Sequence, residues 1–225
     1  MKKILGFPFG NKQNRHDEML SFDDEIESIF DEDDDDDYCE FDEFMEEFAD
    51  AAQGIRMLAL DVDGVLTDGT IYMGNDGELF KGFNAKDGMG ISCALRNGLE
   101  VAIITGRKSE IIHRRAEELG ITTIIEGAKD KREALRSLRR LRGLSVEEVA
   151  YVGDDLNDLP AFAESGLTFA PDDAAEDVYD AADIGLDNPG GRGAVREAIE
   201  YILAAQDKWE KIVASYEQAG QGDRQ

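Results

Sequence analysis

From residue 54 onward, short apolar segments alternate with helical ones, and this alternation constrains the fold more than any other feature. Five segments have the apolar pattern of buried strands: 57–61, 100–105, 121–125, 148–153 and 167–170. Amphipathic stretches predict helices near 88–97, 109–119, 129–142 and 156–164, and a final helix from about 192 to 213. Strands joined through helices are typical of parallel sheets, because each connection must run back from the carboxyl end of one strand to the amino end of the next. We therefore predict an α/β fold: a Rossmann-like parallel sheet with helices on both faces.

One segment interrupts this alternation. Residues 70–83 have the pattern of a β-hairpin that turns between Gly74 and Gly77, inserted after the first strand. The gap from Asp61 to Thr105 otherwise has room for one helix, as does the gap from Lys131 to Asp154. We therefore expect a capless domain, in which the hairpin flanks the carboxyl edge of the sheet.

Two carboxylates follow the first strand. Asp61 and Asp63 leave the strand on the same side, and Gly64 lets the backbone turn there. Two close anionic groups repel each other unless a cation or a shared proton intervenes. A hard divalent cation with oxygen ligands, most simply Mg²⁺, fits that requirement. The alternative is an acidic turn that only caps the strand.

Three further polar clusters follow later strands or open later helices. Thr105-Gly106-Arg107 offers a hydroxyl and amides to an anion, Lys131 offers an amine, and Gly153-Asp154-Asp155 is a second acidic cluster. Each could alone be a helix cap or a solvated residue. Together they follow parallel strands whose carboxyl ends meet in one crevice, where α/β sheets bind ligands. The sequence therefore predicts an active site at this edge.

These clusters resemble, in order, the four motifs of the haloacid dehalogenase-like hydrolases. The motif segments are Asp61–Asp68, Ile104–Arg107, Lys131 and Gly153–Asp158. Two further segments, Ile71–Gly74 and Gly190–Glu197, look like those of the 3-deoxy-D-manno-octulosonate 8-phosphate phosphatase subfamily. The resemblance covers roughly residues 55–215. It implies a Mg²⁺-dependent phosphatase acting through an aspartyl-phosphate.

The resemblance also implies roles for individual residues. Asp61 would be the nucleophile and Asp63 the acid and base, while Thr105 and Lys131 would hold the phosphoryl oxygens. Mg²⁺ would be held by Asp61, the backbone carbonyl of Asp63 and Asp154, with Asp155 or Asp158 orienting waters. Substrate contacts are implied for Asp63, Asn84, Lys86, Asp87, Gly88, Arg107, Arg115 and Lys131.

The identity of the sugar acid is less constrained than the reaction. Lys86 and Ser92 stand where a member of that subfamily carries arginine, so two bidentate forks are missing. A nine-carbon, sialic-acid-type 9-phosphate therefore remains an alternative to the eight-carbon substrate. A non-catalytic regulatory oligomer is a third reading, disfavoured because every catalytic position is filled.

Assembly is a further expectation from the resemblance. An open crevice leaves water unexcluded from a small substrate. Similar capless enzymes form tetramers whose hairpins pack together and whose C-terminal tails close a neighbour's site. We expect a homotetramer, with Gly190–Gly193 as a candidate lid.

Charge divides the chain into two parts. The net charge is −27, and residues 1–53 alone carry 19 acidic and 4 basic side chains, including the run Asp33–Asp37. We predict that 1–53 is a disordered acidic extension, which could serve as a protein-interaction module, and that 54–225 is the hydrolase domain with its tail. Such acidity argues against binding to nucleic acid or to anionic membranes. We expect a cytoplasmic protein.

Overall fold

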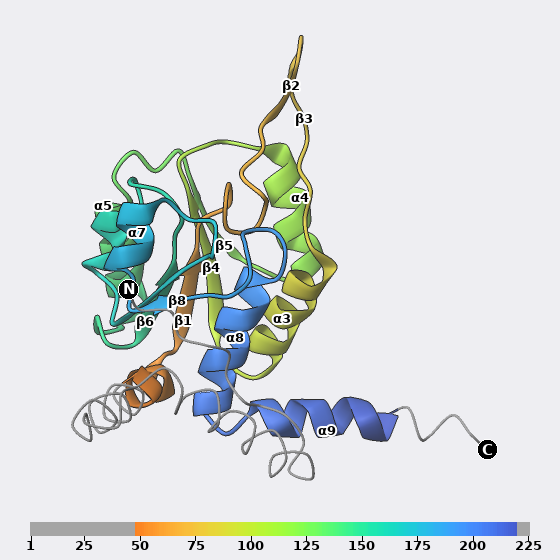
Figure 1. The fold of residues 1–225 in the computed structure, drawn as a ribbon, viewed down its shortest axis with the longest axis vertical. Helices are drawn as coiled ribbons and strands as arrows, with labels where there is room; N and C mark the ends of the chain where they lie inside the picture. The colour runs from red at the N-terminus through yellow and green to blue at the C-terminus, as the bar shows by residue number, and fades with distance from the viewer. Residues whose placement is uncertain (1–47, 220–225) are drawn as a thin grey trace, which may run out of the picture.

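A single parallel sheet organises the computed structural model, which describes residues 48–219 (Figure 1). Its six strands lie in the order β5-β4-β1-β6-β7-β8, and every neighbouring pair is parallel. The strands are β1 (Met57–Leu60), β4 (Glu100–Thr105), β5 (Thr123–Glu126), β6 (Val149–Val152), β7 (Leu167–Ala170) and β8 (Ile184–Gly185). The first strand in sequence therefore lies in the middle of the sheet, and its carboxyl end opens at the centre of one edge.

The central strand is apolar on both sides because helices cover both faces of the sheet. Leu58 and Leu60 of β1 belong to one core, and Met57 and Ala59 belong to the other; all four are fully buried. This two-sided burial explains why β1 is a continuous apolar run rather than an alternating one.

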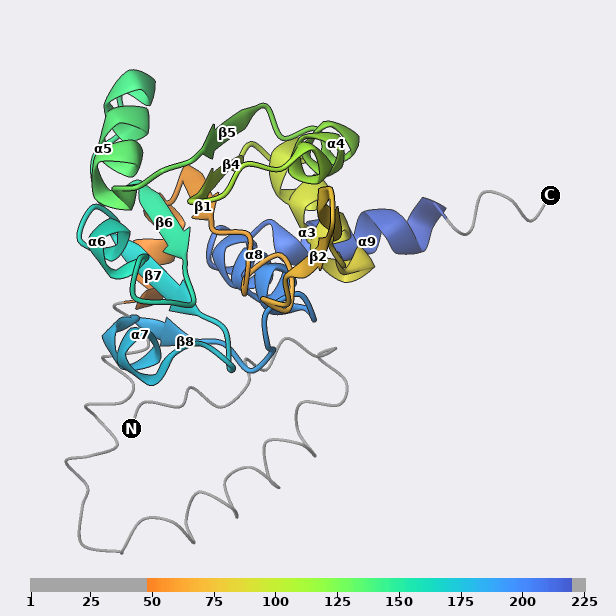
Figure 2. The ribbon, with the colours of Figure 1, turned by 90° about the horizontal axis from the view of Figure 1, so that it is seen from above.

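Two helical layers sandwich the sheet (Figure 2). One layer contains α3 (Ala85–Arg96), α4 (Glu110–Leu119) and α8 (Ala194–Ala205), which bury Ile91, Ile112 and Ile199 in the first core. The other contains α5 (Lys131–Arg142), α6 (Leu159–Phe162) and α7 (Glu176–Ala181), which bury Leu135, Phe162 and Val178 in the second. The predicted α/β architecture with helices on both faces is confirmed.

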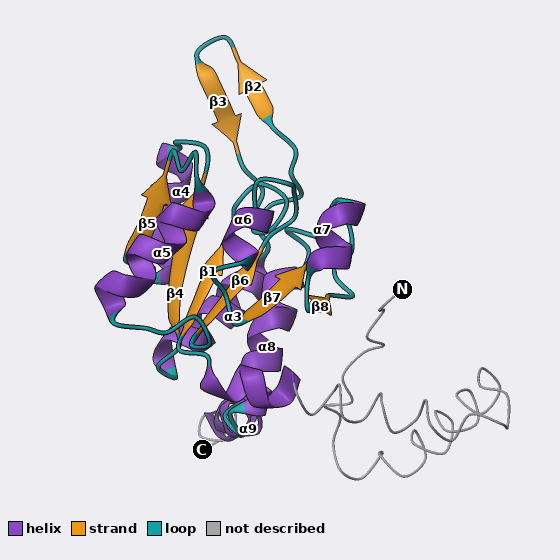
Figure 3. Cartoon of the chain, turned by 90° about the vertical axis from the view of Figure 1, so that its left-hand side faces the viewer, coloured by secondary structure: helices purple, strands orange, loops and turns teal. Residues whose placement is uncertain are grey.

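The inserted hairpin stands apart from the sheet. Strands β2 (Tyr72–Gly74) and β3 (Gly77–Phe80) pair antiparallel, with Gly74 opposite Gly77 as the sequence predicted. Figure 3 shows the hairpin rising beyond the carboxyl edge of the sheet. Its apolar side chains Met73, Leu79 and Phe80 are all more than half exposed, so the arm carries apolar surface into solvent.

Three details differ from the sequence-based expectation. Helix α7 and strand β8 were not predicted, because both are short and neither shows a strong periodic pattern. The predicted helix 192–213 is two helices, α8 and α9 (Trp209–Ala219). The break contains Asp207 at φ 54°, and the Lys208 amine there donates to the carbonyl of Asn97 at 3.0 Å. This tertiary hydrogen bond helps to anchor the corner.

Residues just before the predicted domain boundary pack on the core. Residues 48–54 are helical, Ala52 is fully buried, and the Gln206 amide donates to the carbonyl of Ile55 at 2.8 Å. The boundary expected between residues 53 and 54 therefore falls inside a helix that packs on the core. The remainder of the predicted acidic extension, including Asp33–Asp37, lies outside the described residues. Within residues 48–219, no helix has both the length and the apolar character needed to cross a membrane.

Candidate active site

The turn after β1 places two carboxylates at the middle of the sheet edge. The Asp61 amide donates to the carbonyl of Val152 at 3.1 Å, which continues the pairing with β6. The carbonyl of Val62 then accepts the amides of Leu66 and Thr67, at 2.9 and 3.0 Å. This tight turn needs Gly64 at φ +91°, a region that other residues rarely adopt. Asp61 is thereby held at the strand end, with Asp63 on the turn that follows.

Lys131 connects the first carboxylate to the second acidic cluster. It is the first residue of α5, and its amine lies 2.8 Å from Asp61 Oδ2 and 2.6 Å from Asp158 Oδ1. Burial alone would lower the pKa of Lys131, but the charges of Asp61 and Asp158 raise that pKa above its ordinary value. Lys131 therefore remains a cation in the site.

Asp158 is fully occupied by donors from the protein. Its Oδ1 accepts from Lys131 and from the Tyr151 hydroxyl at 2.7 Å. Its Oδ2 accepts the amides of Asp154 and Asp155, at 3.2 and 3.4 Å. The side chain is completely buried. This carboxylate holds the acidic loop and Lys131 in place, and it has little remaining capacity for another ligand.

The residues at this point fit a divalent cation. One carboxylate oxygen from each of Asp61, Asp154 and Asp158 can be chosen so that all three lie within 4.8 Å of one another. Asp158 is already occupied, but Asp154 Oδ1 is buried without a hydrogen-bond partner among the described residues. Buried carboxylate oxygens normally have a partner, so an oxygen without one indicates a ligand from outside the protein. Mg²⁺ binds oxygen donors of this kind.

The electrostatics of the two remaining carboxylates agree with this fit. Burial, together with the charges of Asp61 and Asp158, raises the pKa of Asp154 to about 8. Burial and the charge of Asp158 raise the pKa of Asp61 to about 6, although the charge of Lys131 acts in the opposite direction. A cation placed between Asp61 and Asp154 would favour the ionised form of both.

Three of the predicted site residues, Asp63, Thr105 and Arg107, lie together beside the carboxylate cluster and form what we call the rim of the site. Asp63 Oδ2 lies 3.7 Å from Arg107 Nε, and the Thr105 hydroxyl accepts the Arg107 amide at 3.3 Å. Thr105 is the last residue of β4 and is buried, whereas Arg107 is half-exposed. The loop Thr105–Arg107, the second-motif loop, thus places the Arg107 cation beside the carboxylate of Asp63.

The first turn of α3 gathers part of the predicted substrate-binding set. Asn84 caps the helix by accepting the Lys86 amide at 2.8 Å. The Arg115 guanidinium lies over the Phe83 ring, 5.6 Å from its centroid. A Cβ atom at Gly88 would lie 2.4 Å from Arg115 Nη2, so the arginine passes directly over the glycine backbone.

The other two predicted contacts on α3 differ in their environments. Lys86 is exposed, as a residue that meets a ligand from solvent would be. Asp87 is 1% exposed and accepts the Arg196 amide of α8 at 2.8 Å. Burial raises the pKa of Asp87 despite that hydrogen bond. In this chain the Asp87 carboxylate therefore joins two helices, and its accessibility is lower than a substrate-binding role suggested.

The glycine-rich segment predicted as a candidate lid packs against the turn after β1 of the same chain. The Gly191 amide donates to the carbonyl of Val65 at 2.9 Å, and a Cβ at Gly190 would stand 1.8 Å from the carbonyl oxygen of Gly64. Only residues without side chains allow this approach. Gly190 and Gly191 therefore pack against the turn that carries Asp61 and Asp63, and the expectation that Gly190–Gly193 covers a neighbour's site stays a prediction.

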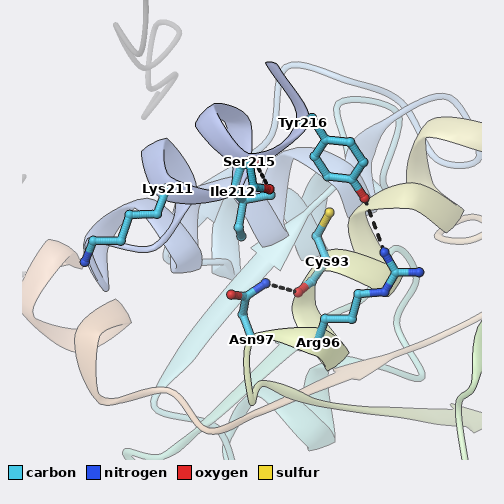
Figure 4. A pocket seen from close by; sticks show the side chains of 7 residues that line it. All are labelled: Cys93, Arg96, Asn97, Lys211, Ile212, Ser215 and Tyr216. Carbon is cyan, nitrogen blue, oxygen red and sulfur yellow. Dashed lines mark hydrogen bonds between the residues drawn. The ribbon is translucent and has the colours of Figure 1, made fainter. Parts of the chain in front are cut away.

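A cavity of about 420 Å³ lies elsewhere, between the end of α3 and α9 (Figure 4). Its lining side chains are Cys93, Arg96, Asn97, Lys211, Ile212, Ser215 and Tyr216. Asn97 directly precedes the turn into β4, so the cavity is at the amino-terminal edge of the sheet. It is therefore separate from the carboxylate cluster at the opposite edge.

Two site residues were missed by reasoning from sequence. The Lys81 amine forms an ion pair with Asp63 Oδ1, and the Tyr151 hydroxyl bonds to Asp158. Lys81 lies between Phe80 and Gly82, where a lysine has the appearance of a solvated loop residue. Tyr151 is recognisable only as an unusual polar tip in the apolar run of β6. Neither sequence pattern points to the partner.

Comparison with known proteins agrees with this geometry. A family model described as haloacid dehalogenase-like hydrolase matches residues 90–166. The 3-deoxy-D-manno-octulosonate 8-phosphate phosphatase KdsC of Escherichia coli (strain K12) is 50% identical over 157 residues, which cover 70% of this chain and 84% of that protein.

Two solved structures are also similar. The 3-deoxy-D-manno-octulosonate 8-phosphate phosphatase from Yersinia pestis is 46% identical, covers 73% of this chain and 89% of its own, and has a TM-score of 0.72. The corresponding phosphatase from Moraxella catarrhalis, in complex with a magnesium ion, a phosphate ion and a KDO molecule, is 40% identical with a TM-score of 0.74. That match covers 76% of this chain and 99% of the other.

Proposed function

This chain belongs to the haloacid dehalogenase-like hydrolases and is a phosphoric monoester hydrolase, and on that premise we propose that it hydrolyses 3-deoxy-D-manno-octulosonate 8-phosphate to the free sugar acid and phosphate. The observation that carries the proposal is the buried contact of 2.8 Å between Lys131 and Asp61, beside an Asp154 oxygen that has no hydrogen-bond partner within residues 48–219. This arrangement provides a nucleophile, a cation for phosphoryl oxygens and a metal ligand within one cluster.

The reaction proceeds in two displacements. In the first, an Asp61 oxygen forms a bond to phosphorus while the bond from phosphorus to the sugar oxygen breaks, and Asp63 gives its proton to that oxygen. In the second, Asp63 takes a proton from water as the water oxygen attacks phosphorus. The bond between Asp61 and phosphorus then breaks, which releases phosphate and regenerates both carboxyl groups. Lys131 holds a phosphoryl oxygen throughout.

Mg²⁺ would be held by Asp61, the backbone carbonyl of Asp63 and Asp154. When bound, it supplies charge neutralisation that allows an anionic carboxylate to approach an anionic phosphate. The chain itself keeps the ligands in place: Asp158 orients the amide of Asp154, and Gly64 gives the Asp154 carboxylate room against the turn.

The substrate's polar groups would meet the surface between the rim and the first turn of α3. The donors for a carboxylate and hydroxyls would come from Arg107, Asn84 and Arg115, and Gly88 leaves room for Arg115 above the α3 backbone. Neither Lys86 nor Ser92 can form the paired hydrogen bonds that an arginine makes with a carboxylate. They are the reason for testing a nine-carbon 9-phosphate as the competing substrate.

The hairpin supports a proposal about assembly. Ile71, Met73 and Leu79 expose apolar surface on this arm, and Tyr72 and Phe80 stack with ring centroids 4.2 Å apart. Burial of such arms against one another would remove this surface from water. We propose a homotetramer built through the hairpins.

One assay tests the reaction and its substrate together. Phosphate release is measured with Mg²⁺ on the eight-carbon 8-phosphate, the nine-carbon 9-phosphate and a simple ester, for the parent protein and Asp61→Asn. We expect the highest kcat/KM on the eight-carbon ester and loss of turnover in Asp61→Asn. A preference for the nine-carbon ester would replace the substrate, and full turnover in Asp61→Asn would reject the nucleophile.

A further inference from the structure

We propose that Lys81 is a positioning residue for the reaction: it fixes the carboxyl group of Asp63 so that Oδ2 is the oxygen that exchanges the proton with the leaving group. The inference rests on the proposed role of Asp63 as acid and base. It adds a residue from the hairpin to a site otherwise built from the loops that follow β1, β4, β5 and β6.

Lys81 is buried although it lies at the base of an exposed arm. It directly follows β3, and its side chain is 2% exposed, whereas the preceding residues Leu79 and Phe80 are more than half exposed. Its amine lies between Asp63 Oδ1 and Glu78 Oε1, the latter at 3.0 Å. A buried ammonium is costly unless it is paired, and here both partners are carboxylates. The two contacts together define where the amine lies.

Glu78 links this pair to the second-motif loop. Its Oε2 accepts a hydrogen bond from the hydroxyl of Ser109, which is the N-cap residue of α4 and lies two residues after Arg107. The Ser109 amide donates to Glu126 at 2.8 Å, which ties the start of α4 to the end of β5. Lys81 is therefore anchored through Glu78 to rigid elements, and Asp63 is anchored through Lys81.

The two oxygens of Asp63 are held unequally. Oδ1 is bound to the buried Lys81, whereas Oδ2 lies 3.7 Å from the half-exposed Arg107, beyond hydrogen-bonding range. Oδ2 is consequently the atom free to donate a proton to the leaving oxygen and to take one from water. Without Lys81, the half-exposed Arg107 would be the cation left beside Asp63 and Glu78, and the repulsion between the two carboxylates would turn Asp63 away from this orientation.

The test exploits the fact that a general acid matters most for a poor leaving group. We compare kcat/KM for the sugar phosphate, whose leaving oxygen needs a proton, with kcat/KM for p-nitrophenyl phosphate, whose leaving oxygen does not. General acid catalysis contributes about 10²- to 10⁴-fold. For Lys81→Met we expect a loss of about 10- to 100-fold on the sugar phosphate and less than about threefold on the aryl ester, as misplacement of such an acid implies. Lys81→Arg should recover most of the loss, because it keeps a cation between the carboxylates.

Equal losses on both esters in Lys81→Met would overturn the inference, since they would indicate a general structural or phosphate-binding role. Glu78→Gln provides a second variant that keeps Lys81 in the chain; we expect a smaller change of the same kind, and an unchanged ratio between the esters would count against the anchoring. Asp63→Asn separates this inference from the function proposed above. If Asp63→Asn fails to discriminate between the esters, the acid role itself is wrong; if it discriminates and Lys81→Met does not, only the role of Lys81 is wrong.

Discussion

The carboxylate of Asp154 lies directly against Gly64: a Cβ atom at Gly64 would stand 1.9 Å from Asp154 Oδ2. The two residues come from the first and fourth motifs, 90 positions apart in the chain. Their contact joins the turn that carries the proposed nucleophile to the loop that carries the proposed metal ligand Asp154. The glycine is required twice here, once for its φ of +91° and once for this approach.

The contact predicts the effect of Gly64→Ala. The new methyl group must displace the Asp154 carboxylate, and the left-handed backbone adds strain of roughly 1–2 kcal/mol. We expect a loss of Mg²⁺-dependent turnover of more than about 100-fold, an effect typical of small misplacements in a site, while the protein still folds. Initial rates across a Mg²⁺ titration, with circular dichroism on the same sample, measure this. Gly98→Ala is the matched control, because Gly98 also has positive φ, at 83°, but no atom lies within 4 Å of the added Cβ. Similar rates in the two variants would contradict the prediction.

Mg²⁺ affinity should rise with pH. The metal binds ionised carboxylates, and in the metal-free protein the pKa of Asp61 is about 6 and that of Asp154 is about 8. Between these values, binding must release protons, so the apparent Kd falls as the pH rises from about 6 to above 8. Isothermal titration calorimetry at pH 7 in buffers of different ionisation enthalpy measures the released protons. A Kd that does not change over this range would contradict the metal assignment.

The same pKa values predict how metal-free stability depends on pH. A carboxyl group whose pKa is raised on folding favours the folded state while it is protonated and opposes folding once it is ionised. The melting temperature in EDTA should therefore fall as the pH rises from about 4 to 8, and added Mg²⁺ should restore it most at the upper end. Asp154→Asn should flatten both trends. Differential scanning fluorimetry is sufficient for the comparison.

Ionised Glu164 should stabilise the layer that contains α5 and α6. This contribution should increase with pH, which is opposite to the effect of Asp61 and Asp154. Hydrogen bonds from Arg136 and Arg139, with Nη2 to carboxylate distances of 2.6 and 3.1 Å, lower the pKa of Glu164 to about 2. A depressed pKa contributes stability that is complete above the ordinary value of 4.5 and is lost as the pH falls towards 2. Glu164→Gln should therefore lower the melting temperature by a few degrees at pH 7, with a difference that shrinks between pH 4.5 and 2. A difference that stays constant over this range would contradict the assignment.

The hairpin predicts an assembly phenotype. Leu79 is 61% exposed, so Leu79→Glu should leave the folded monomer intact while placing charge on the proposed contact surface. We expect the parent protein to have the mass of a tetramer in multi-angle light scattering and the variant to dissociate. Leu141→Glu is the control, because Leu141 is 76% exposed on α5, far along the chain from the hairpin. A monomeric parent protein would reject the tetramer.

The sequence by itself determined the local elements and the edge of the sheet at which the candidate site lies. Apolar runs such as 57–60 and 149–152 specify buried strands through their own composition, and Gly74 and Gly77 specify the hairpin turn. The motif residues Asp61, Thr105 and Asp154 then come together simply because parallel strands end on one side. Local periodicity and topology were enough for this level of description.

Only the tertiary structure decided which side chains pair within that edge. Lys81 lies 18 residues from Asp63, Lys131 lies 27 from Asp158, and Asp87 lies 109 from Arg196. No periodic pattern encodes such contacts, because each depends on how separate segments pack rather than on their local composition. For the same reason, the packing of Gly190 and Gly191 against the turn after β1 could not be read from the sequence. Close packing against the Gly64 and Thr67 backbone, visible only in three dimensions, fixes the position of that segment.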